Sequence, residues 1–133
     1  MSNIQDFLNA KTFAVAGASR DRNKYGNRVF RALLEAGRQV VPLNPTAGMV
    51  EGHNAYASIK AVSPAPEALS IVTPPMVTRQ IIVEAISAGV KHVWMQPGAE
   101  DAEGSAAARA AGLNVIDDGS CILVLLSIER RKG

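Results

Sequence analysis

The stretch with the clearest chemical potential runs from Phe13 to Ser19, where an apolar segment ends in the small residues Gly17, Ala18 and Ser19. Such residues leave room for a ligand to approach the backbone. A helical pattern begins after Gly26, so the free N–H groups and the positive dipole end of that helix would face the same place. The arrangement suits a bound phosphate. The alternative is that strand, glycine and helix are an ordinary connection of an α/β fold.

The loop that follows Ser19 adds three cations, Arg20, Arg22 and Lys24. Positive charge at this point would favour an anionic ligand. The two glycines that bound the loop are nine positions apart, which departs from the G-x-G-x-x-G spacing of dinucleotide-binding loops. The sequence therefore predicts a phosphate-bearing ligand that need not be NAD.

The end of the second predicted strand also bears on the ligand. An NAD site has an acidic residue there that binds the ribose hydroxyls, whereas this chain has Asn44 followed by Pro45. Asn44 could still bind a ribose or an adenine, and Pro45 offers a rigid apolar wall. The alternative is that Asn-Pro simply starts a turn.

The third predicted strand ends in Val72, Thr73, Pro74 and Pro75. We expect Thr73 to cap the next helix, with the prolines in its first turn. Consecutive prolines also form a stiff surface with few hydrogen-bond donors. Such a surface suits an apolar ring or a thin chain such as pantetheine, with Thr73 as the polar contact.

The remaining candidate residues do not form a catalytic set. Gln96 and Gly98 follow the fourth predicted strand, and a glutamine side chain cannot act as an acid or a base. Cys121 has no identifiable His or Asn partner, so it is expected to be a small buried residue rather than a nucleophile. His53 and His92 lack metal-ligand spacing. The pattern therefore favours binding over catalysis.

The elements that must position these residues alternate between strand and helix. Three helices are predicted to end at Gly37, Gly89 and Gly112, each followed by an apolar strand. The five predicted strands are 12–16, 39–43, 68–72, 91–95 and 113–116. A short helix is expected near residues 4–8, whereas periodicity does not decide whether 122–128 is strand or helix.

This alternation predicts the α/β fold class: a single Rossmann-like, doubly wound domain over residues 1–133, with a five-stranded parallel sheet and helices on both faces. We expect the spatial strand order 3-2-1-4-5. Ligands of such sheets bind at the carboxyl ends of the strands, in the crevice where the strand order reverses. That crevice is predicted to lie between the first and fourth strands.

Composition narrows the class of protein. A chain of 133 residues with 47% hydrophobic content is expected to form one core, without room for a second catalytic domain. A net charge of +2 and 5% aromatic residues argue against a nucleic-acid partner. The single cysteine excludes an internal disulfide, and no export signal or membrane-length apolar run is evident. We therefore expect a cytoplasmic protein with no membrane partner.

Taken together, the motifs resemble the small CoA-binding protein family. They are Val15–Ser19, Tyr25-Gly26, Pro42–Pro45, Val72–Pro75 and Trp94–Gly98. The likeness covers essentially the whole chain in order and spacing. This family is similar to the N-terminal CoA-binding domain of the succinyl-CoA synthetase α subunit, which also uses a second domain with a phosphorylated histidine. The chain has no room for that domain, so we do not expect ligase activity.

The resemblance implies that coenzyme A, or an acyl-CoA, binds at the carboxyl ends of the strands. The implied contacts are Gly17, Ala18 and Ser19 at the pyrophosphate, with Arg20, Arg22 or Lys24 for the phosphate charge; Asn44 and Pro45 at the adenosine; Val72, Thr73, Pro74 and Pro75 along the pantetheine; and Tyr25, Gln96 and Gly98 nearby. One departure is Asp117-Asp118, where carboxylates would repel a nearby phosphate. Either that loop is remote from the phosphates, or CoA affinity is reduced.

Three hypotheses follow for the function. The first is a CoA-binding protein without catalysis of its own. The second is an NADP-type oxidoreductase fragment in which Arg20, Arg22 or Lys24 binds the 2′-phosphate. The third is a CoA-binding subunit of a separate acyl-CoA ligase or transferase chain, and a homo-oligomer is also possible. We further expect that Gly17→Val would block the ligand without unfolding the sheet.

Overall fold

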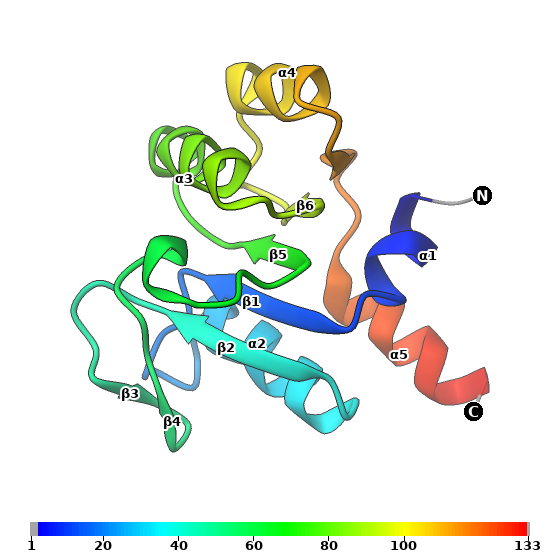
Figure 1. Cartoon of the computed structure of the whole chain (residues 1–133). Coiled ribbons are helices and arrows are strands. Elements are labelled where there is room, and N and C mark those ends of the chain that lie inside the picture. The colour runs from blue at the N-terminus through cyan, green and yellow to red at the C-terminus, as the bar shows by residue number, and fades with distance from the viewer. Residues whose placement is uncertain (1–2, 133) are drawn as a thin grey trace.

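Strand β1 (Thr12–Ala16) lies inside a five-stranded parallel sheet in the computed structural model, which describes residues 3–132. The other strands of this sheet are β2 (Gln39–Leu43), β5 (Ala68–Ile71), β6 (His92–Met95) and β7 (Asn114–Ile116). Figure 1 shows the sheet with helices on both sides. The predicted α/β class and the five parallel strands are confirmed.

The predicted strand order is wrong. The sheet runs β2-β1-β5-β6-β7, so its five strands, counted along the chain, lie in the order 2-1-3-4-5. The third strand pairs with β1 rather than extending the sheet beyond β2. Pro42 in β2 has no N–H to donate, which suits β2 to an edge position rather than to the interior place that the prediction gave it. The strand order therefore reverses between β1 and β5, not between the first and fourth strands.

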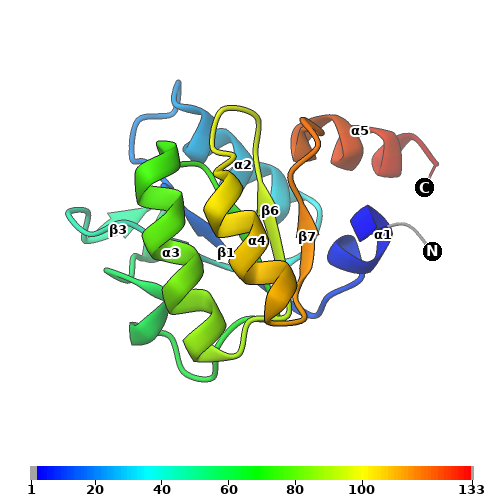
Figure 2. The same cartoon turned by 90° about the horizontal axis from the view of Figure 1, so that it is seen from above.

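Two helical layers cover the sheet, as Figure 2 shows from above. One layer contains α1 (Asn3–Leu8), α2 (Tyr25–Glu35) and α5 (Ile122–Lys132); the other contains α3 (Pro75–Ala88), α4 (Ala102–Ala110) and the short 3-10 helix η1 (Ile59–Ala61). Phe30 and Trp94 are fully buried between the sheet and the first layer of helices. Ile71 and Ile82 are fully buried between the sheet and the second layer. The domain is thus doubly wound.

The helices begin and end close to where the sequence predicted, with one exception at the start of α3. Gly37, Gly89 and Gly112 all have positive φ, as their predicted role at helix ends requires. Residues 122–128 are helical, with Ile122 and Leu126 buried on one face of α5. Thr73 does not cap α3, because the N-cap residue is Pro74 and the Thr73 hydroxyl lies 2.7 Å from that of Thr78.

The connection between β2 and β5 contains a small hairpin that the sequence did not predict. Its strands are β3 (Met49–Val50) and β4 (His53–Asn54), which pair antiparallel. Beyond it, the Tyr56 N–H donates to the Pro42 carbonyl at 3.0 Å, and the Asn44 N–H donates to the Tyr56 carbonyl at 2.9 Å. The chain therefore runs along the outer edge of β2. None of the helices within residues 3–132 is long and apolar enough to cross a membrane.

Candidate functional site

The two glycines that bound the phosphate loop, residues 17–26, are required by close packing. Gly17 has a φ of +86°, and a Cβ atom placed on it would overlap the Val72 carbonyl. A Cβ atom on Gly26 would overlap the Gly17 carbonyl. The end of β1 is therefore packed tightly between β5 and the start of α2. The expectation that Gly17→Val leaves the sheet intact is wrong, since valine would force the backbone apart at this junction.

The start of α2 presents free N–H groups beside this loop. The first helical bond is donated by the Arg28 N–H to the Lys24 carbonyl at 3.1 Å, so the N–H groups of Tyr25, Gly26 and Asn27 have no helical acceptor. The side chain of Lys24 does not cap them. Together with the helix dipole, they form a place where an anion can bind.

The loop itself is held by its own side chains. The Ser19 hydroxyl accepts from the Asp21 N–H at 3.0 Å, and Ala18 is fully buried. Arg20, Arg22 and Lys24 are exposed. The predicted cations therefore lie on the solvent side of the loop, where they can meet a phosphate from outside.

An open pocket lies at the carboxyl ends of β5 and β6, and we call it the Tyr25 pocket. Its volume is about 540 Å³, and its lining is mostly apolar. The lining residues are Tyr25, Val72, Thr73, Pro74, Pro97, Gly98, Ala99 and Cys121. Five of these were predicted from the sequence, whereas Pro97, Ala99 and Cys121 were not among the predicted contacts.

A second apolar pocket, which we call the Pro45 pocket, lies on the side of β1 and β2. Its volume is about 390 Å³, and Thr73 lines it as well as the Tyr25 pocket. The lining residues are Ala16, Gly17, Leu43, Pro45, Ala57, Ser58, Ile59, Thr73, Val77, Gln80, Ile81 and Glu84. The two pockets therefore flank the switch point between β1 and β5, with Thr73 common to both.

A hydrogen-bond network closes the inner end of the Tyr25 pocket. The Tyr25 hydroxyl lies 2.6 Å from the Cys121 sulfur and donates to the Gln96 side-chain carbonyl at 3.2 Å. Gln96 is fully buried, accepts from the Ile122 N–H at 2.9 Å and donates to the Ser70 hydroxyl at 3.1 Å. Burial, followed by the bond with Cys121, raises the pKa of Tyr25. The phenol therefore stays protonated at neutral pH.

The side chain of Asn44 forms hydrogen bonds with other parts of the protein. Its side-chain amide donates to the Ala18 carbonyl at 2.7 Å, and its side-chain carbonyl accepts from the N–H groups of Thr46 and Ala47 at 2.9 and 3.0 Å. The Asn-Pro pair thus forms a turn that is tied to the phosphate loop, in line with the structural alternative. Pro45 remains exposed and lines the Pro45 pocket.

The structure brings together some of the predicted residues and separates others. Gly17, Pro45 and Thr73 share one pocket, while Arg20, Lys24 and Pro75 line neither. The residues that sequence reasoning missed come mainly from α3 and the segment around η1. Val77, Ile81 and Glu84 have the spacing i, i+4, i+7, which places them on one helix face, and this was the signal that could have found them.

The acidic loop after β7 lies elsewhere. Asp117 forms an ion pair with Arg109 at 2.8 Å, and this guanidinium lowers the pKa of Asp117. Asp118 accepts from the Ser120 N–H at 3.0 Å. Both carboxylates line a separate small pocket beside α1 rather than the Tyr25 or Pro45 pocket. The two carboxylates therefore lie apart from both pockets.

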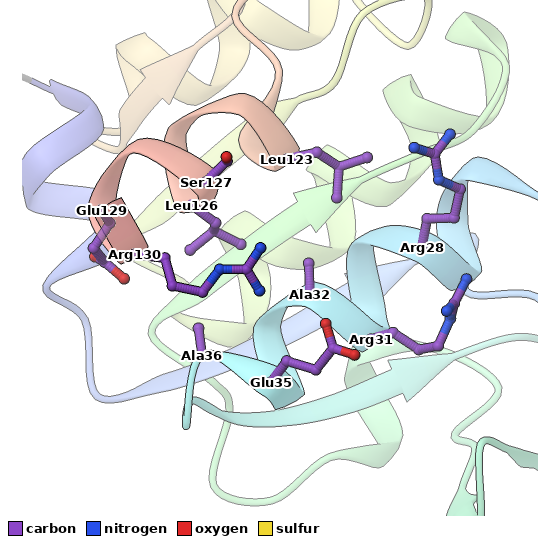
Figure 3. Close-up of a pocket in the computed structure, with 10 residues that line it drawn as sticks. All are labelled: Arg28, Arg31, Ala32, Glu35, Ala36, Leu123, Leu126, Ser127, Glu129 and Arg130. Atoms are coloured by element: carbon purple, nitrogen blue, oxygen red, sulfur yellow. The ribbon is translucent and has the colours of Figure 1, made fainter. Parts of the chain in front are cut away.

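A further groove of about 450 Å³ lies between α2 and α5. Figure 3 shows Arg28 and Arg31 projecting from α2 and Arg130 from α5, around Ala32 and Leu126. The groove contains none of the residues predicted to bind the ligand. Within residues 3–132, no group of three or more His, Cys, Asp or Glu side chains could hold a metal ion.

Comparison with known proteins identifies the family. A family profile described as "CoA binding domain" matches residues 11–127, which include the phosphate loop and both pockets. The chain belongs to the CoA-binding domain family. The predicted resemblance is confirmed.

Two solved structures show how widely this CoA-binding domain fold is shared. A conserved hypothetical protein from Pyrococcus furiosus is 37% identical, with a TM-score of 0.80 over 86% of this chain and 97% of that one. A hypothetical protein from Pyrococcus horikoshii is 29% identical, with a TM-score of 0.89 over 100% of this chain and 94% of that one. The Rossmann-like fold is thus found in proteins of similar length.

The same domain is similar to part of larger enzymes. The acetate–CoA ligase (ADP-forming) II subunit alpha of Pyrococcus furiosus is 38% identical over 88 residues, which are 65% of this chain and 19% of that subunit. An acetyl-coenzyme A synthetase of Ca. Korarchaeum cryptofilum, solved with phosphate and ADP, is 28% identical with a TM-score of 0.77. The match covers 89% of this chain and 28% of the synthetase. The chain therefore spans less than a third of the length of either protein.

Proposed function

We propose that this chain binds coenzyme A, or an acyl-CoA, across the carboxyl ends of β1 and β5. The observation that carries the proposal is the position of Thr73, which lines two apolar pockets on either side of the switch point between β1 and β5. CoA has the matching order of parts, with a charged pyrophosphate between an aromatic base and a long thin chain. Membership of the CoA-binding domain family supports this ligand.

In this proposal the pyrophosphate lies at the start of α2. The free N–H groups at the start of α2 would donate to it, and Ser19, which is partly exposed, leaves room beside them. The exposed cations of the loop would screen its charge.

The two ends of the ligand then occupy different pockets. The adenosine fits the Pro45 pocket, where Pro45, Ile59 and Val77 supply apolar surface for a flat base. The pantetheine would pass Thr73 and Pro74 into the Tyr25 pocket, whose prolines offer few competing donors. The thiol or acyl end would then lie near Tyr25 and Cys121. No catalytic step is part of this proposal.

Titration calorimetry with CoA, 3′-dephospho-CoA and NADPH tests the proposal. We expect saturable binding of CoA. The absence of saturable CoA binding at millimolar concentration would overturn it. Tighter binding of NADPH than of CoA would instead favour the NADP-type oxidoreductase alternative.

A second candidate function is that of a CoA-binding component that works with a separate catalytic chain. It is favoured by the similarity to a ligase subunit alpha, of which this chain spans 19%. Gel filtration and mass spectrometry of the protein isolated from its native source test it. A stoichiometric partner that carries a ligase or transferase activity would support this role, whereas isolation as the chain alone would contradict it.

A further inference from the structure

A carboxylate from the β3–β4 turn reaches the phosphate loop. The Glu51 side chain accepts from the Asn27 amide at 3.0 Å and lies 3.5 Å from Nε of Arg22. The Glu51 side chain is 22% exposed, and that of Arg22 is 65% exposed. A negative group thus lies within contact distance of one of the three cations that the loop offers to a ligand.

Asn27 fixes this carboxylate to the loop backbone. The Asn27 side chain is fully buried, and its amide also donates to the Ser19 carbonyl at 2.8 Å. Its carbonyl accepts from Nε of Arg31 at 2.7 Å, and Arg31 donates to the Arg22 carbonyl at 3.0 Å. Glu51 is therefore linked through Asn27 to both ends of the segment from Ser19 to Arg22. A change in the charge of Glu51 would therefore act on the loop through direct hydrogen bonds.

The position of Glu51 has an electrostatic consequence for any bound anion. A carboxylate 3.5 Å from Arg22 neutralises part of its field and repels a negative ligand at the same place. Glu51 makes a single contact of 3.5 Å with the Arg22 guanidinium, whereas a phosphate that approaches from solvent can accept two parallel N–H bonds from it. Arg22 is mostly exposed, so its side chain is free to exchange one acceptor for the other.

We propose that Glu51 competes with the phosphate of the ligand for Arg22, and thereby sets the affinity of the loop for negative charge. This inference rests on the proposed function. In the unliganded protein Arg22 pairs with Glu51. When a phosphate binds, Arg22 turns to it, while Glu51 keeps its hydrogen bond with Asn27. Glu51 is thus a specificity-determining residue that opposes binding of the anion.

The test is a double-mutant cycle with CoA as the probe, measured by calorimetry at low ionic strength. Glu51→Gln removes the charge and keeps an oxygen that can accept from Asn27. We expect it to tighten CoA binding by about two- to fivefold, the range of an exposed ion pair. Most of the gain should disappear when Arg22→Gln is also present, because the residue for which Glu51 competes is then gone and only the direct repulsion between Glu51 and the ligand is left. It should also shrink in high salt.

Two further variants keep the test decisive. Glu35→Gln removes the same charge about 12 Å along α2 from Asn27 and should leave CoA affinity unchanged. Glu51 has a φ of +49°, so Glu51→Asn removes the charge in a residue type that adopts this conformation more readily, which guards against poor folding. Unchanged or weaker CoA binding in both Glu51 variants would overturn the inference, as would a gain that is undiminished without Arg22. Failure of the wild-type protein to bind CoA would overturn the proposed function itself, and the inference with it.

Discussion

The hydroxyl of Tyr25 lies 2.6 Å from the sulfur of Cys121, although the two residues are 96 positions apart. Tyr25 is the first residue of α2, and Cys121 directly precedes α5. The same hydroxyl donates to Gln96, which follows β6. The segments that leave β1, β6 and β7 therefore meet at one phenol, at the inner end of the pocket that we propose for the thiol or acyl end of CoA.

Tyr25→Phe tests how much this junction contributes to stability. The substitution removes the hydroxyl and both of its hydrogen bonds. We expect the free energy of unfolding to fall by about 1–3 kcal/mol, the net value of two typical hydrogen bonds. Denaturant unfolding measures it. Tyr56→Phe is the matched control, since the hydrogen bonds that hold Tyr56 to the end of β2 are made by its backbone N–H and carbonyl. Equal losses in the two variants would contradict the prediction.

Gly26→Ala is predicted to destabilise the protein although alanine is the better helix former. The added Cβ would overlap the Gly17 carbonyl, and backbone cannot move aside as a flexible side chain can. We expect a loss of about 1–3 kcal/mol, typical of overpacking. Thermal unfolding would measure it. Gly48→Ala is the control, because no atom lies within 4 Å of its added Cβ. A Gly26→Ala variant as stable as the wild type would show that the junction can relax.

Val77→Glu tests the adenosine end of the proposed site. Val77 lines the Pro45 pocket, so a carboxylate there would place charge against an apolar base and repel the phosphates. We expect CoA affinity to fall by at least about tenfold, or about 1.4 kcal/mol. Both Val77 and Val83 are about half exposed on α3, and Val83 does not line the pocket. Val83→Glu should therefore bind CoA as the wild type does, and equal binding by both variants would refute the adenosine placement.

His92 predicts a dependence of stability on pH. Burial lowers the pKa of His92, against the opposing effect of Asp6 and Glu67, and its Nδ1 lies 3.0 Å from the Asn114 amide. The unfolded chain, with a pKa of about 6.5, then binds the proton more readily than the folded one. The contribution of neutral His92 to the free energy of unfolding should be fully present above about pH 6.5. It should be lost as the pH falls through the lower pKa of the folded state. Thermal unfolding at several pH values measures this, and His92→Gln should flatten the curve in this range.

The sequence predicted those features that depend on local chemistry. Gly37, Gly89 and Gly112 mark helix ends because the left-handed turn after a helix favours glycine wherever it occurs. Gly17 was singled out because small residues would let a ligand approach the backbone, and in the structure the Val72 carbonyl leaves no room for a side chain there. These signals need no knowledge of distant parts of the chain.

Features that depend on distant contacts were not predictable in this way. The strand order is decided by which strand pairs with β1, and apolar composition does not distinguish β5 from its neighbours. Gln96 was predicted to lie near the ligand. In the structure its side-chain amide and carbonyl form hydrogen bonds with Ser70 and Ile122 inside the protein. Thr73 was expected to cap a helix, and its bond with Thr78 became evident only from the fold.

The segment at Tyr56 also covers part of one edge of the sheet. An edge strand with free N–H and carbonyl groups can recruit strands from other molecules and so begin aggregation. In β2, Pro42 has no N–H to offer, and its carbonyl is already occupied by Tyr56. The same contacts that lead the chain from the Pro45 turn towards β5 thus cover the carboxyl-terminal part of the β2 edge. Concentrated solutions of this protein are expected to resist growth of intermolecular sheet from β2.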